Sequence, residues 1–331
     1  MAAGARDDNA SALWYRDPGT VEIRREAIAP PGTGEMRVKT LYSAISRGTE
    51  SLVAAGSVPE SEHDSMRAPL QDGEFPFPIK YGYAVVGTAK DGPEALVDRT
   101  VFCLYPHQDA FHAPAEMVVP VPAGVPASRA VLAANMETAL NGVWDAGILP
   151  GDKVAVVGAG LVGLLIAYLA ARIPGTEVTV VDVNGDRRGL AEDFGCRFAS
   201  PEQANDRAGG CDVVIHTSAT AAGLATSIAL AGFEARIVEM SWYGEGSVNI
   251  PLGGRFHSQR LSIVASQVGN VPVQRRARWP FSRRLAAALA LLADDRLDKL
   301  FSGETDFPDL AQDYCQILAD PGTLCHRIRY R

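Results

Sequence analysis

Three glycines in a short stretch of chain have the spacing of a turn that can hold a phosphate. Gly158, Gly160 and Gly163 lie between a short apolar run and an amphipathic stretch. The first glycine permits a tight turn, the second lets backbone amides approach a pyrophosphate, and the third lets the next helix lie close to the strand. The positive end of that helix attracts the pyrophosphate. We therefore expect a dinucleotide site formed by Gly158, Gly160, Leu161, Val162 and Gly163.

A carboxylate follows at the distance that this chemistry requires. Asp182 lies nineteen residues after Gly163 and directly follows a second apolar run, where it can accept hydrogen bonds from the adenosine ribose. A 2′-phosphate would meet its negative charge, so NAD is expected as the cofactor and NADP is disfavoured. Arg187 and Arg188 lie a few residues further on and could bind such a phosphate, which leaves NADP open as the alternative.

The elements that must position these residues occupy three stretches of chain. From Ala12 to about Pro126, apolar segments with alternating polarity are punctuated by glycine and proline, which predicts strands and turns. Strands and helices then alternate to about Ser266, which predicts a parallel sheet with crossover helices. Two helices, at 281–293 and 309–319, precede a final strand. The expected fold class is α/β: a β-rich domain, an inserted nucleotide-binding domain and a C-terminal return to the first.

Composition restricts the function classes. The chain has 331 residues, 47% hydrophobic and 21% charged, which is ordinary for a soluble protein of two domains. Its net charge of −8 argues against nucleic acid or an anionic membrane as the main partner. Five scattered cysteines favour a reducing cytoplasm. Residues 1–12 lack a signal-peptide core and predict a frayed tail, and the longest apolar helical candidate, 161–171, is too short to span a bilayer.

Motifs along nearly the full chain resemble the medium-chain dehydrogenase/reductase superfamily, the alcohol dehydrogenase fold. They are VVPVPAGVPASRAVLAANMETALNGVWDAGILPGDKVAVVGAGLVG, LYSAISRGTE and the strands around YGYAVVG. Within the superfamily, SRGTE most resembles the branch of the bacteriochlorophyllide hydroxyethyl dehydrogenases. The resemblance implies a GroES-like catalytic domain at 1–131, a Rossmann domain with a doubly wound parallel sheet at 132–267, and a return to the catalytic domain at 268–331. It also implies a homodimer formed through an edge strand of the nucleotide domain.

The positions that hold zinc in members of this superfamily carry other residues here. Ser46 or Arg47 stands where a cysteine is expected. Tyr83 and Ala84 replace a histidine and a glutamate, and the segment ANMET has no cysteine. A catalytic zinc needs three protein ligands of N, S or O type and an open position. The four-cysteine structural lobe is also missing, since Cys103 is the only cysteine in that part of the chain. We therefore expect no zinc.

Alcohol oxidation without a metal needs other groups to hold the developing oxyanion. Tyr83 could donate a proton to an alkoxide, helped if a nearby cation lowers the pKa of its phenol; the alternative is a packed strand tyrosine with a capped hydroxyl. Glu50 could pair with Arg47 or take a proton from substrate, or it could form an ordinary surface salt bridge. Arg47 either replaces a metal ligand or reaches the cofactor pyrophosphate.

Two further titratable residues are candidates by resemblance. Glu137 begins a helix whose end points at the active site in the superfamily, so it could bind substrate or act as a general base; a first-turn glutamate stabilised by the helix dipole is the alternative. His107 lies where the structural zinc lobe is missing and the chain passes the cleft. It could relay a proton, although a histidine in a loop is more often simply solvated.

The nicotinamide end of the cofactor is held in the superfamily by groups at strand ends, which here implies Ser218, Met240, Ser241 and Gln267. A basic segment follows, with Trp279 among five arginines: Arg275, Arg276, Arg278, Arg283 and Arg284. Against an acidic background, this segment suggests an anionic substrate or a partner subunit, and a solvated, salt-bridged face is the alternative.

The sequence therefore predicts an NAD-dependent, zinc-independent oxidoreductase that interconverts a secondary alcohol and a ketone of a polar small metabolite. The catalytic candidates are Tyr83, Glu50, Glu137 and His107. An NADPH-dependent enone or quinone double-bond reductase is the enzymatic alternative, and a nucleotide-binding scaffold or sensor that has lost catalysis is the other. Substrate identity and reaction direction do not follow from the sequence, because loops such as 54–77 shape the pocket.

Overall fold

The computed structural model describes residues 9–331, which form two compact units. The first unit contains the chain up to Ala134 together with Leu285–Arg331, and the second unit is Asn135–Arg284. The boundaries fall inside two helices, α3 (Ala133–Ala146) and α9 (Phe281–Leu291). Within residues 9–331, no helix has both the length and the apolar character needed to cross a membrane.

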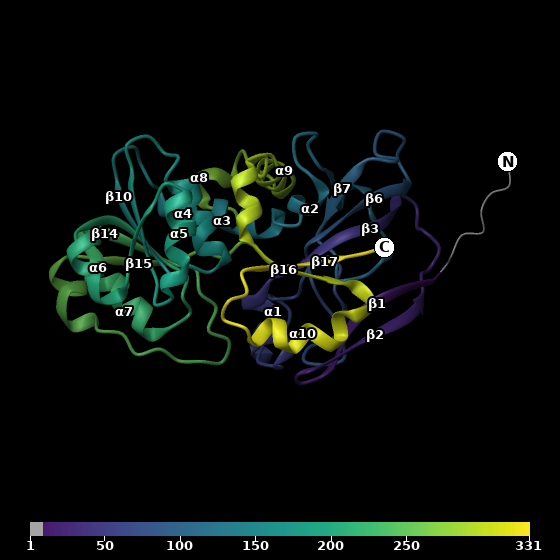
Figure 1. Ribbon diagram of the computed structural model, residues 1–331, viewed down its shortest axis with the longest axis horizontal. Helices are drawn as coiled ribbons and strands as arrows, with labels where there is room; N and C mark the ends of the chain where they lie inside the picture. The colour runs from purple at the N-terminus through teal and green to yellow at the C-terminus, as the bar shows by residue number, and fades with distance from the viewer. Residues whose placement is uncertain (1–8) are drawn as a thin grey trace. The chain divides into compact units, whose positions relative to one another are not determined.

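The first unit is built from strands. They are β1 (Asn9–Asp17), β2 (Thr20–Ala27), β3 (Glu35–Ile45), β4 (Asp72–Gly73), β5 (Ile79–Lys80), β6 (Val85–Asp91), β7 (Thr100–Cys103), β8 (Ala110–Pro114), β9 (Val118–Pro120), β16 (Phe301–Asp306) and β17 (Cys325–Arg329). One sheet has the order β2-β1-β5-β4, and the other has the order β16-β17-β3-β6-β7-β9, with β8 also pairing with β3. The C-terminal β17 lies antiparallel beside β3, which joins the two ends of the chain (Figure 1).

Three helices complete the first unit: α1 (Arg47–Ala54), α2 (Ala127–Ala130) and α10 (Leu310–Ala319). Alternation along the strands buries one side of each, so Met36 and Val38 of β3 pack with Val85 of β6 and Phe111 of β8 in one core. Helix α10 has an amphipathic sequence and buries Leu310, Tyr314, Ile317 and Leu318.

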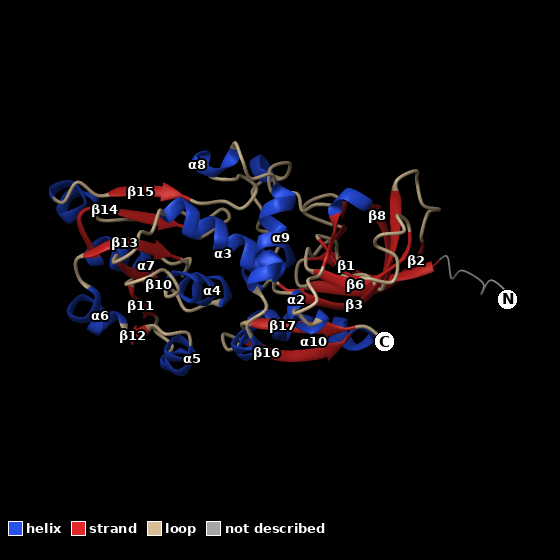
Figure 2. Cartoon of the chain, turned by 90° about the horizontal axis from the view of Figure 1, so that it is seen from above, coloured by secondary structure: helices blue, strands red, loops and turns tan. Residues whose placement is uncertain are grey.

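The second unit is a parallel sheet between helices. Its strands are β10 (Lys153–Val157), β11 (Glu177–Val181), β12 (Arg197–Ala199), β13 (Cys211–His216), β14 (Ala231–Glu239) and β15 (Ser262–Ala265), and its helices are α4 (Leu161–Ala170), α5 (Arg188–Asp193), α6 (Pro201–Ala208), α7 (Ala221–Leu230) and α8 (Val273–Arg276). All strands pair in parallel in the order β12-β11-β10-β13-β14-β15, and their labels follow one another in this order in Figure 2. This is the predicted doubly wound arrangement.

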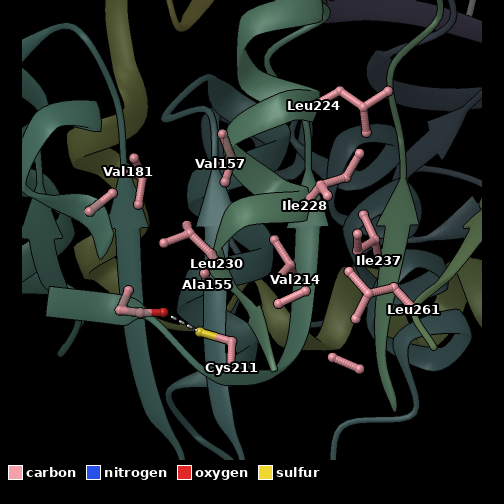
Figure 3. Packing of buried hydrophobic residues seen from close by; sticks show 14 of the residues in the cluster. Ala155, Val157, Val181, Cys211, Val214, Leu224, Ile228, Leu230, Ile237 and Leu261 are labelled. Carbon is pink, nitrogen blue, oxygen red and sulfur yellow. Dashed lines mark hydrogen bonds between the residues drawn. The ribbon is translucent and has the colours of Figure 1, made fainter. Parts of the chain in front are cut away.

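The core of the second unit explains why these strands are continuous apolar runs in the sequence. Val157 of β10, Val214 of β13 and Ile237 of β14 pack against Leu224 and Ile228 of α7, as Figure 3 shows. Both faces of a parallel sheet are covered by helices, so its strands bury side chains on both sides. Each fully buried aliphatic side chain of this kind contributes about 1.5–3 kcal/mol.

Some expectations about elements need correction. The predicted tail at 1–12 is wrong for residues 9–12, which belong to β1 and pair with β2; residues 1–8 lie outside the described part of the chain. The helix that carries Glu137 begins at Ala133, so this glutamate lies in the second turn and is not a first-turn residue stabilised by the helix dipole. Residues 268–284, which we grouped with the C-terminal return, belong to the second compact unit, Asn135–Arg284.

Candidate functional site

The glycine turn has the close approaches that its spacing predicts. Gly158 follows β10 at φ +112°, in the left-handed region that favours glycine. A Cβ on Gly163 would lie 2.0 Å from the Gly158 carbonyl oxygen, so only glycine lets α4 start this close to β10. A Cβ on Gly160 would meet nothing within 4 Å, which leaves open space in front of the turn. The first helical residues after Gly160 are Leu161 and Val162.

This turn lies where the sheet reverses direction. The strands β11 and β12 extend from one side of β10, and β13, β14 and β15 extend from the other. The loops after β10 and β13 meet there, since the Thr217 amide donates to the Val157 carbonyl at 2.8 Å and its hydroxyl donates to the Gly158 carbonyl at 2.8 Å. Open α/β sheets bind ligands at the carboxyl ends of the strands on either side of such a reversal.

Asp182 lies beside the glycine turn. It follows β11 and is half-buried, with Oδ2 accepting from the Ala159 amide at 2.5 Å and Oδ1 accepting from the Asn184 amide at 2.7 Å. Each carboxylate oxygen has a second lone pair and so can accept a further hydrogen bond.

The two arginines after Asp182 lie in the short helical segments that follow β11. Arg187 ends a 3₁₀ turn, Gly185–Arg187. Arg188 lies 3.8 Å from Glu192 and over the ring of Phe198. Arg188 is therefore already paired within α5 and β12.

A hydrogen-bonded cluster that we did not predict occupies the ends of β13 and β14. His216 and Glu239 are the last residues of these adjacent strands and lie opposite each other in the register. The His216 Nδ1 is 2.8 Å from the Glu239 Oε2, and its Nε2 is 2.7 Å from the Ser218 Oγ. The Ser241 amide and the Tyr243 hydroxyl also donate to Glu239, at 2.8 and 3.1 Å.

The charge of this cluster is held on Glu239. Burial raises the pKa of Glu239, but His216 and the Ser241 hydrogen bonds outweigh burial, and the pKa is lowered overall.

Of the predicted nicotinamide-end residues, Ser218 and Ser241 belong to this cluster. The Met240 amide donates to the His216 carbonyl, whereas Gln267 is exposed after β15.

The first unit holds a second cluster around Glu50. His107 Nε2 lies 3.1 Å from Glu50 Oε2, which also accepts from the Tyr15 hydroxyl at 3.0 Å and from the Tyr314 hydroxyl. Oε1 accepts from the Ser46 amide at 2.7 Å. The side chains of Glu50 and His107 are both 0% exposed. The surface salt bridge is therefore wrong for Glu50, and the solvated loop position is wrong for His107.

Burial and hydrogen bonding oppose each other at Glu50. Burial raises the pKa of its carboxyl, but His107, Tyr314 and the Ser46 amide lower it, and the net shift is downward. Burial also raises the pKa of Tyr15 and of Tyr314, and the charge on Glu50 raises both further. These two hydroxyls therefore keep their protons and donate to the carboxylate.

Arg47 does not pair with Glu50. It is the first residue of α1, and its Nε donates to the Leu318 carbonyl near the end of α10 at 2.9 Å. Short-range proximity in sequence suggested the Arg47–Glu50 pair, but the helix places Glu50 on its buried side, toward His107.

Tyr83 lies next to this cluster, between β5 and β6. Burial raises the pKa of Tyr83 to about 12; hydrogen bonds with the Ser46 and Thr49 side chains lower it, and the charge on Glu50 raises it. We expected a nearby cation to lower the pKa of this phenol. The charge that acts on Tyr83 is instead the Glu50 carboxylate, which raises the pKa. The preceding Gly82, at φ +114°, is needed here, since a Cβ would lie 2.9 Å from the His107 ring.

Glu137 belongs to a separate ion pair in the second unit. Its Oε1 lies 3.0 Å from Arg284 Nε, and Arg284 also donates to Asn141 at 2.6 Å and to the Val268 carbonyl at 2.6 Å. Burial raises the pKa of Glu137 and Arg284 partly offsets this. Arg284 is 2% exposed and is therefore not part of an exposed basic face.

The other arginines of the basic segment are exposed: Arg275, Arg276, Arg278 and Arg283. Within residues 9–331 none of the four forms an ion pair with a carboxylate, so the salt-bridged face is not what the chain builds here. Aromatic rings take the place of carboxylates, with Arg283 4.0 Å from the Trp279 ring centre and Trp279 packed on Trp144.

The residues at the usual zinc positions do not fit that ion. Within residues 9–331 no group of three or more His, Cys, Asp or Glu side chains is arranged to hold a metal. Ser46 and Tyr83 bond to each other, and Ala84 has no donor atom. Cys103 is buried, and burial raises its pKa to about 12, which disfavours the thiolate that zinc binds.

Comparison with known proteins agrees with this fold. No family model matches the chain. It is 26% identical over 207 residues to D-guloside 3-dehydrogenase of Escherichia coli, which covers 59% of each chain. It is 29% identical over 126 residues to 2-dehydro-3-deoxy-L-galactonate 5-dehydrogenase of Pseudoalteromonas atlantica, which covers 36% of this chain and 37% of that protein. The match thus spans less than two thirds of either relative.

Solved structures match over almost the whole chain. An alcohol dehydrogenase from Escherichia coli, complexed with NADH, has a TM-score of 0.79 and 18% identity, with 97% of this chain and 99% of that chain covered. A zinc-binding-type dehydrogenase from Sinorhizobium meliloti, bound to NADP, has a TM-score of 0.77 and 19% identity over 97% and 99% of the two chains. The chain thus has the fold of these alcohol dehydrogenase-like proteins, and in sequence it is similar to sugar and alcohol dehydrogenases over part of its length.

Proposed function

We propose that the protein is an NAD-dependent, zinc-independent oxidoreductase that interconverts a secondary alcohol and a ketone of a polar small metabolite. The observation that carries the proposal is the glycine turn after β10, where Gly163 touches the Gly158 carbonyl and Asp182 accepts from the Ala159 amide. This cradle has the glycine contacts, the helix N-terminus and the carboxylate that a dinucleotide needs. When bound, the nicotinamide supplies or accepts the hydride.

NAD is proposed over NADP because of the charge next to the ribose position. The Asp182 carboxylate is fixed there by two backbone amides, and a 2′-phosphate would face it. Of the two arginines that could offset this charge, Arg187 and Arg188, the second lies 3.8 Å from Glu192. The solved neighbours include one with NADH and one with NADP, so the preference is a property to be measured on this chain.

The relatives favour a polar substrate. Both are named as dehydrogenases of sugar derivatives, at a secondary hydroxyl or keto position. We propose a hydroxylated metabolite of this general kind. The SRGTE motif resembles the bacteriochlorophyllide hydroxyethyl dehydrogenase branch, and a ring-bearing substrate of that type is the finer version of the proposal.

Tyr83 is the proposed hydrogen-bond donor to the substrate oxygen. A phenol with a pKa near 12 is protonated at neutral pH, and it can donate to an oxygen that becomes an alkoxide. Glu50 acts as a positioning residue, because it has no exposed atom. It holds the Ser46 amide at the start of α1, where Ser46 and Thr49 bond the Tyr83 hydroxyl. His107 holds Glu50 in turn.

Glu137 is the proposed candidate base of the second unit. Burial raises the pKa of Glu137, which makes its carboxylate a stronger proton acceptor than an exposed one, and Arg284 keeps this carboxylate oriented. We also propose Arg47, Ser218 and Met240 as cofactor contacts.

We further propose that the protein forms a homodimer through β15, the edge strand of the parallel sheet. A cytoplasmic location is also proposed.

The cofactor proposal is tested by titrating the purified protein with NADH and NADPH while following nicotinamide fluorescence, with metal analysis of the same sample. Tighter binding of NADH without stoichiometric zinc is expected. Asp182→Asn is then expected to weaken NADH binding by about tenfold, or about 1.4 kcal/mol, and to reduce the discrimination against NADPH. Tighter binding of NADPH would contradict the Asp182 argument and would favour an enone reductase. One zinc per chain would contradict the ligand argument.

The catalytic proposal is tested with Tyr83→Phe on the sugar alcohols and ketones that the parent protein turns over. We expect kcat to fall by on the order of a hundredfold with unchanged NADH binding, because the donor to the substrate oxygen is lost. Tyr105→Phe is the matched control, since Tyr105 is a tyrosine of the same unit that stacks on Phe111. Equal loss in both variants would assign Tyr83 a packing role.

A further inference from the structure

Ser218, His216 and Glu239 have the geometry of a nucleophile, a base and an orienting acid. The Ser218 Oγ is 2.7 Å from the His216 Nε2, and the His216 Nδ1 is 2.8 Å from the Glu239 Oε2. A carboxylate on Nδ1 selects the tautomer that carries the proton there, so Nε2 is free to accept the serine proton. The dinucleotide cradle does not require a histidine and a glutamate behind this serine.

The acid of the trio is itself held in place. Glu239 accepts from the Ser241 amide at 2.8 Å and from the Tyr243 hydroxyl at 3.1 Å. The side chain of His216 is 0% exposed and that of Glu239 is 14% exposed, whereas Ser218 is only partly buried. The base is therefore shielded from water, whereas the acid and the nucleophile each keep part of their surface exposed.

The space around the Ser218 hydroxyl exists because residue 223 is a glycine. A Cβ there would lie 2.0 Å from the Ser218 Oγ, 2.7 Å from the His216 Nε2 and 3.0 Å from the Thr220 Oγ1. The Ser218 hydroxyl, the His216 ring and the Thr220 hydroxyl thus all lie within 3.0 Å of the place that a Cβ at residue 223 would take. Thr220 accepts from the Gly223 amide at 3.0 Å, so its own hydroxyl proton can be directed to Ser218.

Backbone amides next to this point can receive negative charge. Ala221 and Ala222 are the first two residues of α7, and within residues 9–331 their amides donate to no acceptor. Amides at the start of a helix stabilise an oxyanion, because they point along the positive end of its dipole. The ends of β13 and β14 and the start of α7 therefore bring together the four parts of an acyl-transfer site: nucleophile, base, acid and amide donors.

We infer that the nucleotide-free protein hydrolyses small activated carboxylic esters at Ser218, an activity separate from its oxidoreductase function. The Ser218 oxygen attacks the ester carbonyl carbon while its proton moves to His216 Nε2. The alcohol leaves with that proton and Ser218 is acylated. Water then attacks the acyl group and gives its proton to His216, the carboxylic acid leaves, and Ser218 recovers its proton. Water is the only co-reactant, and no redox change occurs.

This site adjoins the dinucleotide cradle. A Cβ on Gly158 would lie 2.7 Å from the Ser218 amide nitrogen, so the loop with Ser218 packs directly on the glycine turn. A dinucleotide in that cradle would cover Ser218. Ester hydrolysis should therefore be inhibited by the same nucleotide that the protein binds.

The experiment uses the full chain with p-nitrophenyl acetate in the absence of nucleotide, followed by the absorbance of p-nitrophenol, with mass spectrometry of the acetylated peptide. The parent carries Cys315→Ala, because the exposed Cys315 thiol also reacts with such esters. We expect acetylation of Ser218, and a loss of turnover by on the order of a hundredfold in Ser218→Ala and in Glu239→Gln. Thr226→Ala, an exposed hydroxyl on α7, is the matched control and should retain full turnover.

Gly223→Ala keeps the result interpretable if Ser218→Ala is unstable. It removes no reacting group, and alanine favours a helix, but its methyl group takes the position of the Ser218 hydroxyl. We expect the same loss of turnover in a folded protein, with a lowered melting temperature because the methyl group also lies 2.7 Å from the buried His216 Nε2. Acetylation that maps to other residues, or turnover that persists in both Ser218→Ala and Gly223→Ala, would overturn the inference. Hydrolysis at Ser218 that NADH does not inhibit would support the inference and count against the proposed cofactor site.

Discussion

The two units each contain a buried histidine–glutamate pair, and the pairs differ in what surrounds them. Glu50 and His107 are both 0% exposed and bond to Tyr15, Tyr314 and the Ser46 amide, so every partner is a protein group inside the first unit. His216 is equally buried, but Glu239 keeps 14% of its side chain exposed. The same two residue types therefore form a closed network in one unit and an open one in the other.

The two pairs differ in exposure because they lie on different kinds of elements. Glu50 lies on α1 and His107 lies in a loop between β7 and β8, and the two are brought together in the interior by antiparallel sheets. His216 and Glu239 end two adjacent parallel strands, where the chain turns into loops that face ligands. The first pair thus lies inside a unit, and the second lies at the carboxyl ends of parallel strands.

The largest expected effect is on the free energy of unfolding when the Glu50–His107 pair is broken. Glu50→Ala should lower the free energy of unfolding by about 3–5 kcal/mol, because it removes the buried carboxylate to which His107 and the Tyr15 and Tyr314 hydroxyls bond. Urea denaturation measures this. Glu177→Ala, which removes an exposed pair with Arg197, is the control and should cost less than about 1 kcal/mol. A loss for Glu50 no larger than the control would mean that the buried network is not stabilising.

The glycine turn gives the next effect. Gly163→Ala should cost about 1–3 kcal/mol and weaken NADH binding, because its methyl group would press on the Gly158 carbonyl and displace α4. Gly160→Ala is the sharper variant: its Cβ meets no protein atom, so stability should be kept while the methyl group blocks the pyrophosphate. Thermal melting and fluorescence titration on both variants check this. Unchanged NADH binding in Gly160→Ala would argue against the cradle.

Glu239→Ala should cost less than Glu50→Ala. We expect about 1–2 kcal/mol, since water can reach the exposed side of the site and partly replace the lost acceptor for His216 and Tyr243. The comparison is made by urea denaturation under the same conditions as for Glu50. An equal or larger cost would show that the second pair is as closed in solution as the first.

The smallest expected effect is the response to acid. The pKa of Glu50 is lowered in the folded state, so its contribution to stability is complete above the unfolded value near 4.5 and is lost as pH falls through the folded value. A tenfold difference in proton affinity between the folded and unfolded states corresponds to about 1.4 kcal/mol. Melting temperatures between about pH 6 and 3.5 should fall less steeply in Glu50→Gln than in the parent protein. A parallel decline in both would assign the acid sensitivity to other carboxylates.

Local patterns were sufficient for the elements and for half of the candidate site. The glycine turn and Asp182 follow from short-range spacing, and the structure has them within one strand–turn–helix–strand unit. The final strand and the two C-terminal helices also follow from local patterns, with ends shifted by one or two residues. The continuous apolar run at 213–215 predicts a strand of the parallel sheet, but it carries no sign that the next residue, His216, has a glutamate partner.

The partners of the charged residues could not be predicted, because they are distant in sequence. Glu50 and His107 are 57 residues apart, and Glu137 and Arg284 are 147 apart. A pair between Glu50 and Arg47 was one of the alternatives for Glu50, and it is wrong because α1 turns Glu50 inward and Arg47 toward the Leu318 carbonyl. Charge pairing over such separations depends on strand order, which periodicity does not encode.

By itself, the sequence determined the α/β class and the strand–glycine turn–helix–strand unit with its carboxylate, because each is a property of residue types within a short span. Only the tertiary structure decided that His107 bonds to Glu50 and His216 to Glu239, and that His216 also bonds to Ser218. It also decided that Arg284 is buried while the other arginines of its segment are exposed. The physical reason is that burial and hydrogen bonding are set by which strands become neighbours, and that choice is made by the whole chain.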